Sequence, residues 1–203
     1  MIIYSTEFLT SSVDLAKCPA PEYPEYVFVG RSNVGKSSLI NMVLNKRGLA
    51  KTSGTPGKTR TINHYVINKE KRPWFLVDLP GYGYAKVSKK ERTNWEQFIG
   101  DYLRGRENVV CIFVLVDARH TPQQLDIDFV KKLGVWGLPF AIVFTKIDKV
   151  RPREFERILA QHHAELLKHY AELPNIFFTS AEKQEGRDIL LRFIEMTRNE
   201  AKN

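Results

Sequence analysis

The apolar positions of this chain fall into short runs that are separated by polar and glycine-rich segments. Six runs have the length and composition of β-strands, and they cover residues 26–29, 62–69, 74–78, 109–116, 140–144 and 176–178. The polar turn 69–73 joins two of these runs, which predicts a β-hairpin and hence one antiparallel strand. From residue 109 onward, strands alternate with helical segments. This alternation predicts a three-layer α/β fold with a mostly parallel, six-stranded sheet.

Helical spacing of apolar residues and capping signals predict five helices. The first, fourth and fifth are expected at residues 38–45, 152–170 and 187–198. The second begins at an S-x-x-E capping box, Ser88 and Glu91, and reaches about residue 103. The third follows an N-cap at Thr121. Prolines at positions 19, 21 and 24 break regular structure in the first part of the chain. We therefore expect residues 1–25 to form an arm packed on a single domain, residues 26–203.

Composition narrows the class of protein. Hydrophobic residues make up 43% and charged residues 27% of the 203 positions, as in globular domains. The longest apolar run, 109–116, is too short for a membrane span, and the first residues do not form a secretory signal. Two cysteines give no disulfide framework or zinc site, so we expect a cytoplasmic protein. Histidines such as His64, His120 and His162 are interpreted as solvated residues rather than metal ligands.

The chain carries an excess of positive charge, 31 − 23 = +8. Such an excess favours a polyanionic partner, because net charge acts on association rather than on fold. The alternative is that the charge only keeps the protein in solution.

One phosphate-binding motif, G-x-x-x-x-G-K-S, follows the first predicted strand and precedes a helix. Its residues are Gly30, Arg31, Ser32, Asn33, Val34, Gly35, Lys36 and Ser37. In this context the motif is a P-loop, whose two glycines let the backbone turn its N–H groups inward as a nest for anionic oxygens. Lys36 adds a positive charge near the β- and γ-phosphates, and the Ser37 hydroxyl can bind Mg²⁺.

Further polar clusters follow other predicted strands. The first consists of Asp78, Leu79, Pro80 and Gly81. An aspartate that ends a strand opposite a P-loop holds Mg²⁺ through water. The loop 46–61 has hydroxyl groups that can also reach a metal, and its length indicates a functional or mobile segment.

Two more clusters predict which base is bound. They are Thr145, Lys146, Ile147 and Asp148 after one strand, and Thr179, Ser180 and Ala181 after the next. A carboxylate accepts two hydrogen bonds side by side, and guanine, unlike adenine, offers the matching pair of donors. Asp148 is therefore the expected guanine selector. The stem of Lys146 is expected against the base face, and the Ala181 N–H against the guanine carbonyl.

The segments GRSNVGKS, TPGKTRT, DLPGYGYAK, TKIDK and TSA together resemble the translation-factor-related GTPases, and more closely the EngB type, also called YihA or YsxC. The likeness covers about residues 5–195. It implies a Ras-like G domain that hydrolyses GTP to GDP with Mg²⁺, and it places switch I at Gly57, Lys58, Thr59, Arg60 and Thr61. Thr59 would be the second protein ligand of Mg²⁺, and Asp78 would begin switch II. The resemblance also implies a role in large-ribosomal-subunit assembly and in septation during cell division.

Tyr82 stands where Ras-like enzymes carry the glutamine that orients the attacking water. A tyrosine does not orient water in the same way, so we expect slow intrinsic turnover, with Lys36, Thr59 and Asn33 as the catalytic candidates.

Basic and aromatic residues flank both predicted switches. They are Lys46, Arg47, Lys51, Lys58 and Arg60 around switch I, and Tyr82, Tyr84, Lys86, Lys89, Lys90 and Arg92 on and after switch II. Such residues suit RNA backbone and unstacked bases. One hypothesis is that GTP orders both loops into an rRNA-binding face on a monomeric protein. The alternative is an ordinary solvated basic surface with the switch II tyrosine packed inward.

Two other functions stay open at the level of sequence. A P-loop kinase or ATPase would leave Asp148 without a guanine to bind. A GTP-dependent scaffold for division proteins would make hydrolysis incidental.

A potassium effect provides a first test. Related GTPases use a P-loop asparagine, here Asn33, to help bind K⁺, which supplies positive charge; the alternative role of Asn33 is a hydrogen bond within the loop. We expect faster GTP turnover in KCl than in NaCl at equal ionic strength, measured as phosphate release. Equal rates in the two salts would contradict the potassium hypothesis.

Overall fold

The computed structural model describes residues 1–50, 61–83 and 89–200, with only the backbone at 89–92. Several sequence-predicted features therefore lie outside the described residues. These are Gly57, Lys58, Thr59 and Arg60 of switch I, Ser88 of the capping box, and the basic or aromatic residues Lys51, Tyr84 and Lys86. The side chains of Lys89, Lys90, Glu91 and Arg92 are likewise outside the description.

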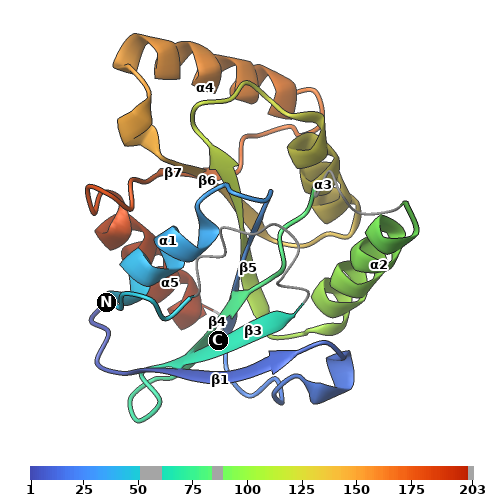
Figure 1. Ribbon diagram of the computed structural model, residues 1–203, viewed down its shortest axis with the longest axis vertical. Helices are drawn as coiled ribbons and strands as arrows, with labels where there is room; N and C mark the ends of the chain where they lie inside the picture. Colours follow the sequence, from blue (N-terminus) through green and yellow to red (C-terminus); the bar gives the residue numbers. More distant parts are fainter. Residues whose placement is uncertain (51–60, 84–88, 201–203) are drawn as a thin grey trace.

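Seven strands form one sheet in the order β1-β3-β4-β2-β5-β6-β7 (Figure 1). Their bounds are β1 Thr6–Ser12, β2 Glu25–Gly30, β3 Ile62–Ile67, β4 Trp74–Asp78, β5 Val109–Asp117, β6 Phe140–Thr145 and β7 Asn175–Phe178. β3 runs antiparallel to both of its neighbours, and the other described strands all run in one direction. The predicted mostly parallel sheet with one reversed strand is thus confirmed.

The sheet has one strand more than the six predicted, because β1 lies in the segment that was expected to lack regular structure. The prolines begin only after β1 ends, and β1 pairs with β3 from Thr6 opposite Ile67 to Ser12 opposite Ile62. The Asn68 side chain fixes the approach, since it accepts from Tyr4 N at 2.7 Å and donates to Ile2 O at 2.8 Å. β1 covers an edge of β3 that would otherwise have unpaired backbone groups.

Helices cover both faces of the sheet (Figure 1). α1 (Lys36–Leu44) and α5 (Arg187–Glu200) pack on one face, and α2 (Lys89–Gly105), α3 (Gln124–Val135) and α4 (Pro152–Leu166) pack on the other. Successive residues of a strand point to opposite faces, so β2 contributes to two cores. Tyr26 and Phe28 pack with α1 and α5, whereas Val27 and Val29 pack on the opposite side.

Several helix boundaries differ from the predictions, and the clearest differences are in α3 and α4. α3 begins at Gln124 with Gln123 as N-cap, so Thr121 does not cap this helix. The Thr121 carbonyl instead accepts a hydrogen bond from the Gln123 side chain at 3.0 Å. α4 ends at Leu166 rather than near Tyr170, whose hydroxyl donates to Val130 O at 2.6 Å and so ties the following turn to α3. Short 3-10 helices occur at η1 (Leu15–Lys17) and η2 (Ile147–Lys149). Among the described helices, none has the length and apolar character that crossing a membrane requires.

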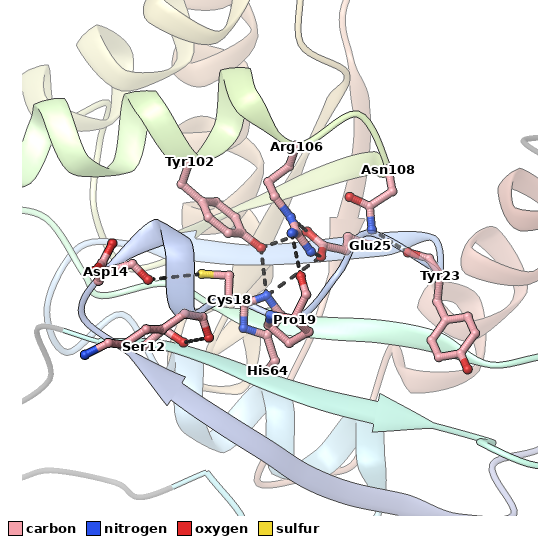
Figure 2. Close-up of polar contacts among 11 residues, drawn as sticks. Ser12, Asp14, Cys18, Pro19, Tyr23, Glu25, His64, Tyr102, Arg106 and Asn108 are labelled. Carbon is pink, nitrogen blue, oxygen red and sulfur yellow. Dashed lines mark hydrogen bonds and ion pairs between the residues drawn. The ribbon is translucent and has the colours of Figure 1, made fainter.

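A buried polar cluster lies where β2 begins (Figure 2). The side chains of Glu25 and His64 are both 0% exposed. Tyr102 of α2 donates its hydroxyl hydrogen to Glu25 Oε2 at 2.7 Å and lies 3.0 Å from His64 Nε2. Arg106 pairs with Glu25 and donates to Pro19 O at 2.7 Å. The interpretation of His64 as a solvated residue is therefore wrong: the cluster joins β2, β3, α2 and the N-terminal arm.

Glu25 stays ionised although it is buried, because its partners stabilise the negative charge. Burial alone would raise the pKa of Glu25, but the contacts with His64, Arg106 and Tyr102 outweigh it and lower the pKa to about 2. The pKa is thus lower in the folded chain than in the unfolded chain, where the ordinary value of 4.5 holds. The ionised cluster therefore contributes stability above about pH 4.5, and that contribution is lost as the pH falls toward 2.

Glu25→Gln tests this cluster. Because the change leaves Arg106 buried without its partner, we expect the free energy of unfolding at pH 7 to fall by about 3–5 kcal/mol. The difference from the parent protein should shrink between pH 4.5 and pH 2, as measured by urea unfolding. Glu96→Gln is the control, since its pair with Lys132 is exposed and should change stability by less than about 1 kcal/mol. An equal effect of both substitutions would contradict the analysis.

Candidate functional site

The predicted polar clusters come together at one edge of the sheet. β2, β4, β6 and β7 are parallel, so the segments that follow them all leave at the same end (Figure 1). The loop 30–37 leads from β2 into α1, Asp78 ends β4, and the segments 145–148 and 179–181 follow β6 and β7. Open α/β sheets bind ligands beyond the carboxyl ends of their strands, so this edge is the candidate site.

The P-loop has two glycines for two different reasons. Gly35 has φ = 102°, in the left-handed region, and caps α1, which already begins at Lys36. Gly30 was expected to bend the chain, but it is needed for close packing, because a Cβ there would lie 2.8 Å from Leu115 O of β5. The free N–H groups of the first turn of α1 therefore lie directly behind the loop, as an anion site requires.

The end of β6 holds the P-loop backbone. Thr145 Oγ1 donates to Val34 O at 2.6 Å, and it also lies 3.2 Å from Val116 O. Lys146 Nζ donates to Asn33 O at 2.6 Å. These bonds join the predicted base-binding segment to the predicted phosphate-binding loop, so the two parts of the site have a fixed relative position.

The predicted metal ligands have the right chemistry for Mg²⁺. Asp78 is 5% exposed, and its carboxylate pairs with the Lys36 ammonium; Ser37 is the next residue of α1. Hydroxyl and carboxylate oxygens are the donors that Mg²⁺ prefers. In the described part of the chain, no group of three or more His, Cys, Asp and Glu side chains forms another metal site. His162, expected to be solvated, is buried with Nε2 at 3.1 Å from His120 O.

The predicted guanine selector lies in a wide cavity of about 970 Å³. Ser180 Oγ donates to Asp148 Oδ1 at 2.6 Å and accepts from Lys183 N at 3.1 Å, which fixes the carboxylate between β6 and β7. Thr179 O accepts from Ile147 N at 3.3 Å. The residues that line the cavity include Gly35, Thr145, Lys146, Asp148, Thr179 and Ala181, together with residues of α1 and the segment 45–48.

The remaining predicted residues are close to this group. Leu79 is buried and donates its N–H to Phe28 O at 3.0 Å, and Pro80 is buried beside it. Thr61 is half-buried at the start of β3, with its hydroxyl 3.3 Å from Asn63 Oδ1. Ser32 Oγ is buried and has no hydrogen-bond partner among the residues that the structure describes. An unsatisfied hydroxyl in the P-loop fits a ligand that brings acceptor oxygens.

The sequence analysis missed Asp117 at the end of β5. Its carboxylate accepts from Lys146 Nζ at 2.8 Å and from Arg119 at 2.9 and 2.7 Å. Burial alone would raise the pKa of Asp117, but the bonds from Arg119 and Lys146 outweigh it and lower the pKa below its ordinary value. The signal was present, because Asp117 directly follows an apolar strand, as Asp78 and Thr145 do.

Tyr82 is not an exposed aromatic residue of a binding face. Its side chain is 6% exposed, and its ring stacks on Phe129 of α3 at 4.9 Å. The alternative of a switch II tyrosine packed inward is therefore correct. The side chain of Arg31 also turns to α3, where it binds Asp126.

Comparison with known proteins agrees with this geometry. A family model described as a 50S ribosome-binding GTPase matches residues 25–146. A protein of Flavobacterium johnsoniae described as "Probable GTP-binding protein EngB" is 50% identical over 201 residues, which are 98% of this chain and 94% of that protein. A protein of Bacteroides fragilis with the same description is 48% identical over 200 residues, 98% of both chains.

Solved structures show the same architecture. A crystal structure described as a probable GTP-binding protein EngB has a TM-score of 0.68 at 20% identity, covering 87% of this chain and 99% of that one. The structure of Era in complex with MgGDPNP and nucleotides 1506–1542 of 16S ribosomal RNA has a TM-score of 0.68 at 26% identity, covering 85% of this chain and 55% of that one.

Asp148→Asn tests base selection. An asparagine offers a donor where guanine needs an acceptor, but this donor suits the second carbonyl of xanthine. We expect guanine-nucleotide affinity to fall roughly 100-fold and xanthine-nucleotide affinity to rise, measured with fluorescent diphosphates. Asp188→Asn, whose side chain is 91% exposed on α5, is the control and should change neither affinity. An unchanged preference for guanine over xanthine would contradict the role of Asp148.

Proposed function

We propose a cellular role that proceeds from one fact: the chain belongs to the EngB family of GTP-binding proteins, enzymes that hydrolyse GTP. The role is that of a GTP-controlled switch in the assembly of the large ribosomal subunit, needed for normal septation in cell division. The observation that carries control by GTP is the bond from Lys146 to Asn33, which joins the segment assigned to base recognition to the phosphate loop. Membership of a GTPase family removes the reason to consider a kinase or an ATPase.

The nucleotide is bound by two sets of groups. The N–H groups of loop 30–37 and Lys36 bind the phosphates, and Asp148 and the Ala181 N–H bind the guanine edge, with the Lys146 stem against the base. We assign segment 78–81 to the γ-phosphate side. The family resemblance assigns the same role to the switch I residues Gly57, Lys58, Thr59, Arg60 and Thr61, of which only Thr61 is among the described residues. This assignment is supported by the cavity that Thr145, Lys146 and Asp148 share.

GTPases of this family generally use Mg²⁺, and Ser37, Thr59 and, through water, Asp78 would hold it here. The ion supplies positive charge that offsets the charge of the phosphates. Lys36 supports the same oxygens through its ammonium group. Asn33 is exposed with φ = 64°, and in the described residues its side chain makes no hydrogen bond, which leaves its amide oxygen for K⁺.

Hydrolysis is slow in this proposal. Water attacks the γ-phosphate in line, and the rate depends on how well the water and the charges are positioned. The side chain of Tyr82 is buried against α3 and does not reach toward a water. A bound partner that supplies positioning groups would then raise the rate.

The ribosomal part of the proposal is supported by charge and by the family. The net charge of +8 suits a polyanionic partner such as rRNA, and the matching family model is described as ribosome-binding. Residues 1–25 act as an arm on a single domain, 26–203, and the protein works as a cytoplasmic monomer. A scaffold for division proteins is a different function, and none of the contacts described above favours it.

Sedimentation with purified 50S subunits tests the switch. We expect co-sedimentation with a GTP analogue and much less with GDP, and binding should weaken as salt rises because counterions are released from the RNA. Arg47→Ala, at the exposed end of the loop after α1, should weaken binding and flatten its salt dependence. Arg157→Ala on the exposed face of α4 is the charge-matched control. Binding that is independent of both nucleotide and salt would contradict the proposal.

A further inference from the structure

Asp126 lies in the first turn of α3 and is 1% exposed, yet it belongs to none of the predicted motifs. Two residues bind it from different parts of the site. Arg31 Nε, in the P-loop, donates to its two carboxylate oxygens at 2.9 and 3.1 Å. The Tyr82 hydroxyl, directly after the D-x-x-G segment, donates to Oδ1 at 2.8 Å. One buried carboxylate therefore links the P-loop, the start of switch II and α3.

The Tyr82 side chain has little freedom in this arrangement. Its ring stacks on Phe129 at 4.9 Å with an interplanar angle of 25°, and it meets Trp95 of α2 edge-on at 6.0 Å. Burial and the neighbouring Asp126 raise the pKa of Tyr82 well above its ordinary value, so the hydroxyl keeps its proton and remains a donor. The orientation of Tyr82 is thus set by both an aromatic and a polar contact.

The backbone of Tyr82 in turn pairs with the P-loop. Tyr82 N donates to Gly30 O at 3.2 Å, and Ser32 N donates to Tyr82 O at 3.1 Å. Because Leu79 N already donates to Phe28 O, the segment 79–82 continues alongside β2 into the P-loop. Gly81 is consequently held against the loop by residues on either side of it.

We propose that Asp126 is a positioning residue for GTP hydrolysis. It acts through Tyr82 and Arg31 and makes no contact with the nucleotide itself. Its carboxylate holds Tyr82, and through Tyr82 also Gly81, beside the P-loop at the γ-phosphate side of the site. There the Gly81 N–H would face the γ-phosphate, which GTP has and GDP lacks. The proposal concerns hydrolysis, so it does not depend on the ribosomal role, but it does rest on the nucleotide assignment given above.

This position predicts a selective defect. In the described structure, residues 33–37 of the loop and Asp148, which are assigned to the parts shared by GTP and GDP, make no contact with Asp126 or with the Tyr82 hydroxyl. Loss of the Asp126 contacts should therefore affect recognition of the γ-phosphate and the rate of its transfer to water, and leave GDP binding in place. Substitution of a residue that only supports the fold would weaken the binding of GTP and of GDP together.

Two substitutions test the positioning role, one at each of the two residues that the Tyr82–Asp126 hydrogen bond joins. Asp126→Asn removes the charge at nearly constant size, and Tyr82→Phe removes only the hydroxyl and keeps the ring. For each we expect a fall of about tenfold in kcat and in affinity for a non-hydrolysable GTP analogue, with less than about a twofold change for GDP. The double variant should lose less than the product of the two single losses, because both changes act on the Asp126–Tyr82 bond, while Asp126→Asn also weakens the pair with Arg31.

The matched control is Asp128→Asn on the same helix, whose exposed carboxylate accepts only from Gln124 in the described structure. It should leave all three quantities unchanged. Equal losses for GTP analogue and GDP together with a lower Tm would show that Asp126 only supports the fold, and unchanged kinetics would show no role; either result overturns the proposal. Continued GDP binding in every variant would show that the nucleotide assignment holds, so that a negative result counts only against the role of Asp126.

Discussion

The candidate site depends on one constraint, which is that the P-loop backbone is held from the side by the end of β6. The side chains of Thr145 and Lys146 donate hydrogen bonds to the carbonyl groups of Val34 and Asn33, respectively. This is possible only because β2, β5 and β6 are parallel neighbours. A loop held in this way does not have to be ordered when phosphate binds, so less of the binding energy is lost. The same bonds fix the position of the P-loop relative to the segment 145–148, the two parts to which we assign phosphate and base recognition.

Much of this arrangement could be predicted because its signals are local. The P-loop, the D-x-x-G segment and the residues around Asp148 each follow an apolar run, and parallel strands must bring such segments to one edge. β1 escaped prediction because Thr6–Ser12 is a mixed, mostly polar segment whose pairing depends on β3. Glu25, His64 and Asp126 escaped for a related reason. Charged or polar side chains in sequence are expected in solvent, and only their tertiary partners make burial tolerable.

Buried charge is concentrated at the two ends of β2 and serves different purposes there. At its amino end, Glu25 pairs with Arg106 and fastens the arm, β3 and α2 together. Beyond its carboxyl end, Arg31 pairs with Asp126, and Lys36 pairs with Asp78. Removing one member of a buried pair leaves the other uncompensated, so each pair is a strict local constraint. The first constrains the frame, and the others constrain the loops that meet the nucleotide.

The place of β1 in the sheet affects how the chain folds during its own synthesis. Thr6 cannot pair until Ile67 has been made, because the partner of β1 is β3, the first strand of the hairpin of β3 and β4. A nascent chain therefore leaves the ribosome with its first strand unpaired, while the segment that joins β2 to the hairpin is still being made. Pairing of the N-terminal strand is consequently a long-range event, although it can occur before β5, β6 and β7 have been made.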